Sequence, residues 1–344
     1  MFRVAGFFVP PIALRFEPST SDGHAGDIRL VRPRQFMNIG ITGASGFLGR
    51  HLRDQFARGG HSMRGLTRNP SMRTPAPSIG AAEVQWVTGS IDEEDSIDDF
   101  VRGLDAVVHA AWHTPGKRFV GGEGDLLAYY ETNMLGTLRL MRAADRAGVS
   151  RFVFISTGAV HGRTIEADSI DETHPLWPTS VYGAAKAAVE TAIAATASWS
   201  ETCCFSTLRP TTIYGVDDPV EQSRYWDLIS EVWDRRTVTA DGGGKVVHAT
   251  DIAAACECLF SAASGAVRGE TFNCTGGFVA KRTVAELAAQ IAGVDATVGG
   301  SADAGKQMDT SKLQALGFAF HQETLLRETV RSLVEAKRKV GDGG

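Results

Sequence analysis

A glycine-rich turn between an apolar segment and an amphipathic segment constrains the fold of this chain most strongly. Residues 38–42 are apolar and have the length of a buried strand, and residues 47–58 continue with the periodicity of a helix. Gly43, Gly46 and Gly49 lie where the strand would pass into the helix. Glycine permits a tight turn at the first position, close approach to a ligand at the second and close helix–sheet packing at the third. The spacing predicts a strand–turn–helix unit.

Short apolar runs and longer amphipathic runs alternate further along the chain. We expect the apolar runs to form strands and the amphipathic runs to form helices. The expected strands cover residues 62–67, 84–87, 106–110, 151–156 and 205–209, and the expected helices cover residues 97–101, 126–147 and 181–198. Strands that are apolar throughout are typical of a parallel sheet covered on both faces. The predicted fold class is α/β, a Rossmann-type doubly wound parallel sheet built from residues 37–210.

The pattern becomes less regular after residue 210. We expect a strand at 271–274, helices at 225–234, 252–262, 284–291 and 323–338, and a turn at Gly242–Gly244. Residues 211–340 are predicted to form mainly a smaller C-terminal substrate-binding lobe. Within this part, residues from about 245 to 275 are expected to return to the Rossmann domain.

The first 36 residues differ from the rest of the chain. Residues 2–14 are apolar, but Pro10-Pro11 interrupt them and no small-residue cleavage site follows closely, which argues against a signal peptide. Residues 17–34 are polar and rich in proline, glycine and aspartate. We predict a disordered extension over residues 1–36. A start codon assigned too far upstream would also produce such a segment.

The composition excludes several classes of function. A net charge of −5 disfavours nucleic acid as a partner, because phosphate binding needs a basic surface. No segment approaches the roughly 20 apolar residues that span a bilayer. The five cysteines lack the spacing of a metal site or a redox pair, which is typical of reduced thiols in a cytoplasmic protein. We therefore expect neither a metal site nor a membrane partner.

The glycine turn predicts a seat for a dinucleotide, because the N-terminus of the following helix favours a pyrophosphate. A carboxylate after the second strand would suit the ribose of NAD. This chain has Leu66-Thr67-Arg68 there, with Arg64 nearby. An arginine suits the additional 2′-phosphate of NADP, although a surface arginine at this position is also compatible with the sequence. The expected cofactor is NADP or NAD, with NADP favoured by Arg68.

A tyrosine and a lysine stand four residues apart at the start of the helix expected over 181–198. Tyr182 and Lys186 would share one face of that helix. A lysine cation about 4 Å away, at an effective dielectric near 20, would lower the pKa of the phenol by about 3 units. The phenol could then exchange a proton with a substrate hydroxyl or carbonyl. The preceding strand ends at Ser156 and Thr157, either of which could hydrogen-bond the reacting oxygen.

Together these motifs resemble the short-chain dehydrogenase/reductase superfamily, and in particular its extended branch of epimerases, dehydratases and reductases. The resemblance runs from Met37 almost to the C-terminus. It includes the segments Val108-His-Ala-Ala111, Asn133-Met-Leu-Gly-Thr-Leu138, Ser156-Thr-Gly-Ala-Val-His-Gly162, Leu208-Arg-Pro-Thr-Thr-Ile-Tyr-Gly215, Val247-His-Ala-Thr-Asp251 and Asp309-Thr-Ser-Lys-Leu313.

The resemblance implies a role for individual residues. Thr157, which stands 25 residues before Tyr182, would be the catalytic hydroxyl, Tyr182 the acid/base, and Lys186 the residue that tunes Tyr182 and holds the nicotinamide ribose. The cofactor site would comprise Gly43, Ser45, Gly46, Phe47, Leu48, Gly49, Arg68, Ile91, Ala110, Ala111, Asn133, Tyr182, Lys186 and Pro210. The substrate would face Trp112, His113, Thr157 and Thr212. His109 and Asp251 would be structural.

The leading hypothesis is an NAD(P)-dependent oxidoreductase that acts on a small carbinol or carbonyl substrate. An NAD-dependent nucleotide-sugar epimerase is the alternative, but Thr212 and Lys245 replace an asparagine and an arginine that such enzymes often carry. A dehydratase is disfavoured because no carboxylate pair follows Thr157. A non-catalytic NAD(P)-binding regulatory protein would have no need for the Thr/Tyr/Lys set. The resemblance also allows a homodimer formed through the helices expected at 126–147 and 181–198.

Overall fold

The computed structural model describes residues 36–69, 71, 84–116, 119–165, 169–196 and 200–342. Met37–Gly344 form one compact unit. The extension predicted over residues 1–36 falls, apart from Phe36, outside the described residues.

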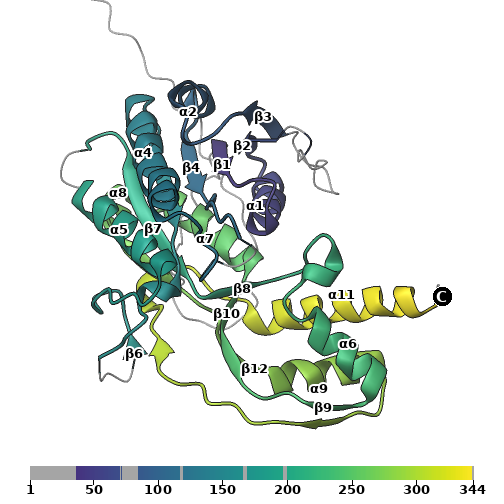
Figure 1. Ribbon diagram of the computed structural model, residues 1–344. Coiled ribbons are helices and arrows are strands. Elements are labelled where there is room, and N and C mark those ends of the chain that lie inside the picture. Colours follow the sequence, from purple (N-terminus) through teal and green to yellow (C-terminus); the bar gives the residue numbers. More distant parts are fainter. Residues whose placement is uncertain are drawn as a thin grey trace, which may run out of the picture. The chain divides into compact units, whose positions relative to one another are not determined.

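A seven-stranded parallel sheet forms the centre of this unit (Figure 1). Its strands are β1 (Asn38–Thr42), β2 (Ser62–Thr67), β3 (Val84–Thr88), β4 (Ala106–His109), β5 (Arg151–Ile155), β7 (Cys204–Pro210) and β11 (Thr271–Cys274). Their order across the sheet is β11-β7-β5-β4-β1-β2-β3, and every neighbouring pair is parallel. The order reverses between β1 and β4, where Ile41 lies between Gly65 and Val108. The predicted Rossmann-type sheet is confirmed.

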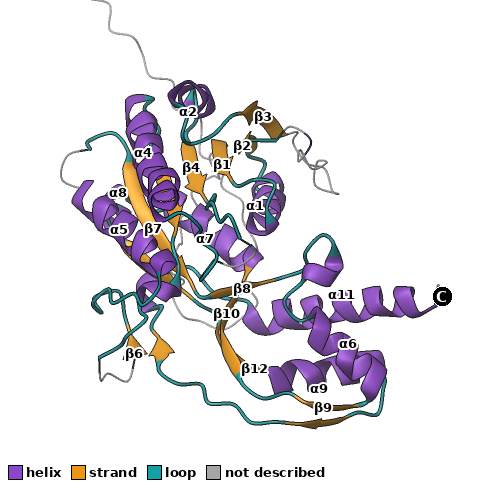
Figure 2. Cartoon of the chain, in the orientation of Figure 1, coloured by secondary structure: helices purple, strands orange, loops and turns teal. Residues whose placement is uncertain are grey.

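Helices cover both faces of this sheet (Figure 2). They are α1 (Phe47–Arg58), α2 (Glu94–Val101), α3 (Leu126–Tyr130), the π turn η2 (Glu131–Leu135), α4 (Gly136–Arg146), α5 (Val181–Thr196), α7 (Ala249–Ser261) and α8 (Ser264–Val267). One buried core contains side chains of α1 and α7, and a second contains side chains of α2, α4 and α5. The helix predicted over 126–147 is interrupted by the π turn. Ser180 caps α5, since its Oγ accepts the Gly183 N–H at 3.1 Å.

Smaller sheets and a third core lie mainly in the C-terminal half. The strands pair as β8 (Thr212–Tyr214), β10 (Gly243–His248) and β12 (Gly277–Ala280), as β9 (Thr237–Thr239) with β13 (Thr297–Gly299), and as β6 (Ser169–Ile170) with β14 (Gln307–Met308). The helical segments are η3 (Gly158–Val160), η4 (Val220–Gln222), α6 (Trp226–Arg235), α9 (Lys281–Ala292), α10 (Ser311–Gln314) and α11 (Gln322–Asp342). Side chains of α6, α9 and α11 form the third core. None of the helices in the described ranges is long and apolar enough to cross a membrane.

The interpretation of Gly242–Gly244 as a turn was wrong for two of the three glycines. Gly242 has a φ of 78° and turns the chain, but Gly243 and Gly244 begin β10 and pair with β12. A Cβ added to Gly243 would lie 2.5 Å from Cζ of Phe278 and 2.6 Å from the carbonyl oxygen of Val279. The glycine is therefore required by the close approach of the neighbouring strand.

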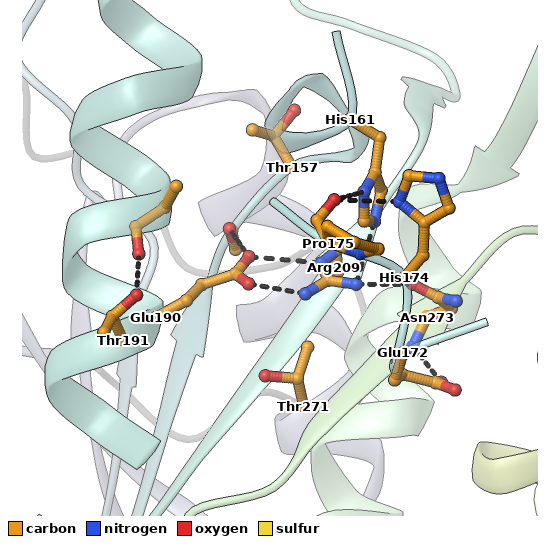
Figure 3. Close-up of polar contacts among 12 residues, drawn as sticks. Thr157, His161, Glu172, His174, Pro175, Glu190, Thr191, Arg209, Thr271 and Asn273 are labelled. Carbon is orange, nitrogen blue, oxygen red and sulfur yellow. Dashed lines mark hydrogen bonds and ion pairs between the residues drawn. The ribbon is translucent and has the colours of Figure 1, made fainter. Parts of the chain in front are cut away.

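A buried ion pair joins α5 to the large sheet (Figure 3). Arg209 lies on β7 and Glu190 on α5, and both side chains are 2% exposed. Arg209 Nη2 donates to Glu190 Oε2 at 2.6 Å, and Nε donates to Oε1 at 3.3 Å. Oε1 also accepts the hydroxyl of Ser156, the residue that follows β5. A two-point ion pair thus fixes α5 against the ends of β5 and β7.

The same guanidinium also reaches the C-terminal half. Its Nη1 lies 3.0 Å from Nε2 of His161 and donates to Oδ1 of Asn273 at 3.2 Å. Asn273 in turn donates through Nδ2 to the carbonyls of Ile170 and Asp309. Burial, with help from Arg209, lowers the pKa of His161 to about 4, so the ring is neutral and Nε2 accepts the bond from the arginine. One arginine therefore connects the large sheet with β6 and the chain after β14.

We predict that breaking this pair destabilises the protein far more than replacing it. Arg209→Met or Glu190→Met alone should lower the free energy of unfolding by about 3–5 kcal/mol, because each leaves one charge buried without its partner. The double substitution should recover most of that loss. Urea unfolding followed by circular dichroism measures all three variants. Arg102→Ala is the control, because its pair with Asp99 is exposed, and it should have no measurable effect. Full additivity of the two single losses would contradict the prediction.

Candidate active site

A cavity of about 730 Å³ opens at the carboxyl ends of the central strands, where the strand order reverses. The glycine turn, the ends of β2, β4 and β5, the start of α5 and the segment after β7 contribute to its wall. Among the predicted site residues, those that line it are Gly43, Ser45, Gly46, Phe47, Leu48, Gly49, Arg68, Ile91, Ala110, Ala111, Trp112, His113, Thr157, Tyr182, Lys186, Pro210 and Thr212. Residues far apart in sequence thus meet in one cavity.

The glycine turn has room for a ligand at one position in particular. Gly43 has a φ of +73°, and a Cβ on Gly49 would lie 2.1 Å from the Gly43 carbonyl oxygen, so the fold itself requires both. Gly46 has an ordinary φ of −77°, and an added Cβ would meet only that oxygen, at 3.4 Å. Gly46 lines the cavity at the N-terminus of α1, where no side chain caps the helix. This free helix end fits a dinucleotide's pyrophosphate.

Tyr182 and Lys186 lie on one face of α5 as predicted, but the expected lowering of the tyrosine pKa is not found. Burial raises the pKa of Tyr182 to about 12, and a hydrogen bond with Thr157 only partly opposes this. Lys186 is engaged elsewhere. Its Nζ donates to the carbonyl of Ile155 at 2.6 Å and lies 3.8 Å from the centre of the Trp112 ring. Burial also lowers the pKa of Lys186 well below its usual value. The phenol is therefore protonated at neutral pH and can donate a proton.

The two candidate hydroxyls after β5 have different partners. Ser156 is 3% exposed and donates to Glu190. Thr157 accepts the Ala159 N–H at 3.2 Å and hydrogen-bonds with Tyr182. Thr157 is therefore the hydroxyl that the fold brings to the tyrosine.

Two other residues from the sequence motifs support the backbone behind the cavity. His109 is fully buried, which lowers its pKa to about 3, and its neutral ring joins Thr42 at 2.6 Å to Thr137 at 2.8 Å. These two hydrogen bonds join β1 and β4 to α4. Asn133 is not among the described lining residues. Its amide accepts from the N–H of His113 at 2.7 Å and donates to the carbonyl of His113 at 2.9 Å. It fixes the segment after β4.

The two arginines near β2 have different surroundings. Arg68 is exposed, lines the cavity and has Nη1 3.3 Å from Nδ1 of His113. Arg64 instead donates to the carbonyls of Phe100 and Arg102 at the end of α2, at 3.0 and 2.6 Å. Arg68 is thus the arginine whose side chain is available to a ligand in the cavity. No carboxylate lines the described part of this cavity.

Phe119 was missed by the sequence analysis. Its ring centre lies 5.4 Å from that of Tyr182, and the residue is 56% exposed. It belongs to an irregular loop after β4, where no periodicity marks a functional residue.

The five cysteines are free, and the described residues contain no cluster of His, Cys, Asp and Glu side chains that could hold a metal ion.

The sequence is similar to several characterised enzymes. It is 30% identical to a 4-hydroxy-2-methyl-3-oxo-4-farnesyl-3,4-dihydroquinoline-1-oxide ketoreductase from Stigmatella aurantiaca, over 76% of this chain and 75% of the relative. It is 36% identical to a dTDP-glucose 4,6-dehydratase from Streptomyces niveus, over 44% of this chain and 47% of the relative. The chain thus spans about half the length of that dehydratase.

The fold is also similar to solved structures, and the sequence matches a family model. The dTDP-glucose 4,6-dehydratase from Streptomyces venezuelae, solved with NAD and TYD bound, superposes with a TM-score of 0.67 at 25% identity, over 86% of this chain and 96% of that one. Residues 39–275 match the model of the NAD dependent epimerase/dehydratase family. The chain therefore belongs to this family, within the extended branch of the short-chain dehydrogenase/reductase superfamily.

Proposed function

We propose that this enzyme reduces a ketone to an alcohol, or oxidises the alcohol in the reverse direction, with NADP or NAD as the hydride carrier. The observation that supports this proposal is the hydrogen-bonded pair of Tyr182 and Thr157 at the cavity that the glycine turn also lines. The seat at Gly46 fits a dinucleotide, and the protonated phenol supplies the proton that carbonyl reduction needs.

The chain's own residues have distinct roles in the proposed reaction. When bound, the nicotinamide supplies or accepts the hydride. Tyr182 donates its proton to the carbonyl oxygen. Thr157 accepts a bond from the Ala159 N–H, which leaves its own proton to orient the same oxygen. We assign Lys186 to the nicotinamide ribose, with the Ile155 carbonyl accepting a hydrogen bond from its Nζ.

Reduction is favoured over the two sugar-nucleotide reactions found among the relatives. The ketoreductase matches over 75% of its length, whereas the dehydratase matches over 47%. A dehydratase needs acid/base carboxylates, and no carboxylate lines the described part of the cavity. Epimerisation of a nucleotide sugar, in which the hydride is returned to the substrate, is the second candidate. It would be supported by NAD that remains bound through purification.

We predict that Tyr182→Phe lowers kcat for carbonyl reduction by about 100- to 10,000-fold, the usual contribution of a general acid, and changes NADPH binding far less. NADPH consumption, measured over a screen of ketones and sugars, together with cofactor titration, tests both parts. Because the pKa of Tyr182 is about 12, reduction should be independent of pH around neutrality, whereas alcohol oxidation, which needs the phenolate, should accelerate as the pH rises. The matched control is Tyr130→Phe, outside the cavity lining. Full activity of Tyr182→Phe would refute the assignment.

We predict that Arg68 selects NADP. Its guanidinium is exposed and borders the cavity, so it can pair with a 2′-phosphate. Arg68→Ala should weaken NADPH binding by about 10- to 100-fold, the loss of a charged hydrogen bond, and change NADH binding less than about twofold. Fluorescence titration with both cofactors measures the difference. Arg142→Ala, which removes an exposed arginine paired with Glu94, should affect neither. Equal losses for the two cofactors would show that Arg68 does not bind the phosphate.

We propose a homodimer through α3, α4 and α5. Leu127 is 80% exposed and Leu135 is 41% exposed, so the segment that leads into α4 presents apolar surface to solvent. Ala188 on α5 is also exposed, and small side chains allow helices of two subunits to approach closely.

We predict a dimer at micromolar concentration that Leu135→Glu converts to a monomer, because the charge would be buried in the interface. Light scattering coupled to size-exclusion chromatography measures the mass. Val340→Glu, at another exposed apolar position, should leave the mass unchanged. A wild-type monomer would contradict the proposal.

A further inference from the structure

Aromatic side chains surround the proposed acid at the mouth of the cavity. The ring centre of Tyr182 lies 6.0 Å from that of Trp112 and 5.4 Å from that of Phe119. Trp112 donates its indole N–H to the hydroxyl of Tyr129 at 2.8 Å. Because that donor is already satisfied, Trp112 offers a substrate its apolar ring. The rings of Tyr182, Trp112 and Phe119 line the cavity.

The loop that carries Phe119 exposes apolar surface beside Tyr182. The N–H of Gly116 donates to the carbonyl of Gly122 at 2.9 Å. Phe119 is 56% exposed and its neighbour Val120 is 54% exposed. Large apolar side chains gathered at the rim of a cavity are typical of a binding site for an apolar ligand.

Charged groups are scarce at this end of the cavity. Among its described lining residues, the Lys and Arg side chains are those of Arg68 and Lys186. Lys186 is 3% exposed and donates to the Ile155 carbonyl, and Arg68 follows β2 on the side assigned to the cofactor. The segment after β7 adds Pro210, Thr211, Thr212 and Ile213, which are uncharged. A diphosphate favours cationic side chains, and the described residues that line the cavity around Tyr182 add no Lys or Arg to Lys186.

We propose that the substrate is an uncharged ketone whose carbonyl carries an aromatic or extended hydrocarbon group, with that group lying against Phe119 and Trp112. This inference rests on the proposed function and names the substrate class for the same site. In the reaction, a hydride from NADPH or NADH bonds to the carbonyl carbon, and the proton of Tyr182 bonds to its oxygen. The carbonyl is reduced to an alcohol, the cofactor is oxidised, and a solvent proton restores the phenol. Through their contact with the apolar group, Phe119 and Trp112 determine the specificity for the ketone.

The test compares ketones that differ only in the apolar group. Wild-type enzyme with saturating NADPH is assayed with acetone, 2-butanone, 2-pentanone, 2-octanone and 2-acetonaphthone, and with UDP-glucose and dTDP-glucose. Along the alkyl series, kcat/KM should rise about three- to fourfold per methylene group buried. Phe119→Ala should lower the ratio of kcat/KM for 2-acetonaphthone to kcat/KM for acetone about tenfold, because acetone has no group that stacks on the lost ring. Phe36→Ala, the same substitution at an exposed position outside the cavity lining, should leave this ratio unchanged.

The outcomes separate this inference from the function on which it rests. Reduction of acetone with no gain along the alkyl series, or equal losses for acetone and 2-acetonaphthone in Phe119→Ala, would overturn the substrate class and leave the proposed function intact. Turnover of UDP-glucose or dTDP-glucose with a higher kcat/KM than any ketone would also overturn it. Absence of NADPH and NADH binding, measured by titration, would instead overturn the proposed function. Selective loss with 2-acetonaphthone, together with an unchanged fluorescence-measured affinity for NADPH, would support the inference.

Discussion

The ion pair of Arg209 with Glu190 is the interaction on which the geometry of the candidate site depends most. Tyr182, Lys186 and Glu190 are spaced by four residues, so they lie on one face of α5. Glu190 anchors that face to β7 through Arg209 and to the end of β5 through Ser156. A buried ion pair repays its desolvation only when further hydrogen bonds satisfy its atoms, and here they hold the tyrosine beside the hydroxyl that follows β5.

The topology of the sheet supplies the second constraint. The chain moves outward in opposite directions from β1 and from β4, so the loops after these strands separate and leave a cavity between them. The neutral ring of His109 joins Thr42 of β1 to Thr137 of α4 and fixes the edge of this opening. Buried hydrogen bonds thus join the two strands at the opening to α4, while apolar cores pack against the sheet.

Much of the Rossmann sheet could be predicted from sequence because its signals are local. The bounds of β1, α1, β2 and β11 match the predicted ones, since each apolar run ends at a residue with a different preference. The strands β8 and β10 were not predicted, because short strands and the glycines at the start of β10 become extended only through pairing with distant segments. That pairing has no counterpart in local periodicity.

Contacts between distant segments also limited the prediction of the candidate site. Residues in ordered motifs, such as Gly46, Thr157 and Tyr182, were predicted and line one cavity. The predicted pKa of Tyr182 was wrong in direction because spacing alone does not reveal the burial of the phenol, which raises its pKa. It also does not reveal the partners of Lys186, namely the Ile155 carbonyl and the Trp112 ring. The hydrogen bonds of Asn133 to the backbone of His113 are equally invisible in a motif, since they depend on the path of a loop.

The burial that raises the pKa of Tyr182 also bears on the direction of the reaction and on the substrate. Burial favours the neutral form of the phenol, and the rings of Trp112 and Phe119 are among its neighbours. A neutral phenol is the form needed to protonate a carbonyl oxygen. The same rings provide an apolar wall, which a hydrocarbon group can cover without leaving a polar group unsatisfied. Proton donation and the preference for an apolar ketone therefore have one physical origin in this proposal, the aromatic packing around Tyr182.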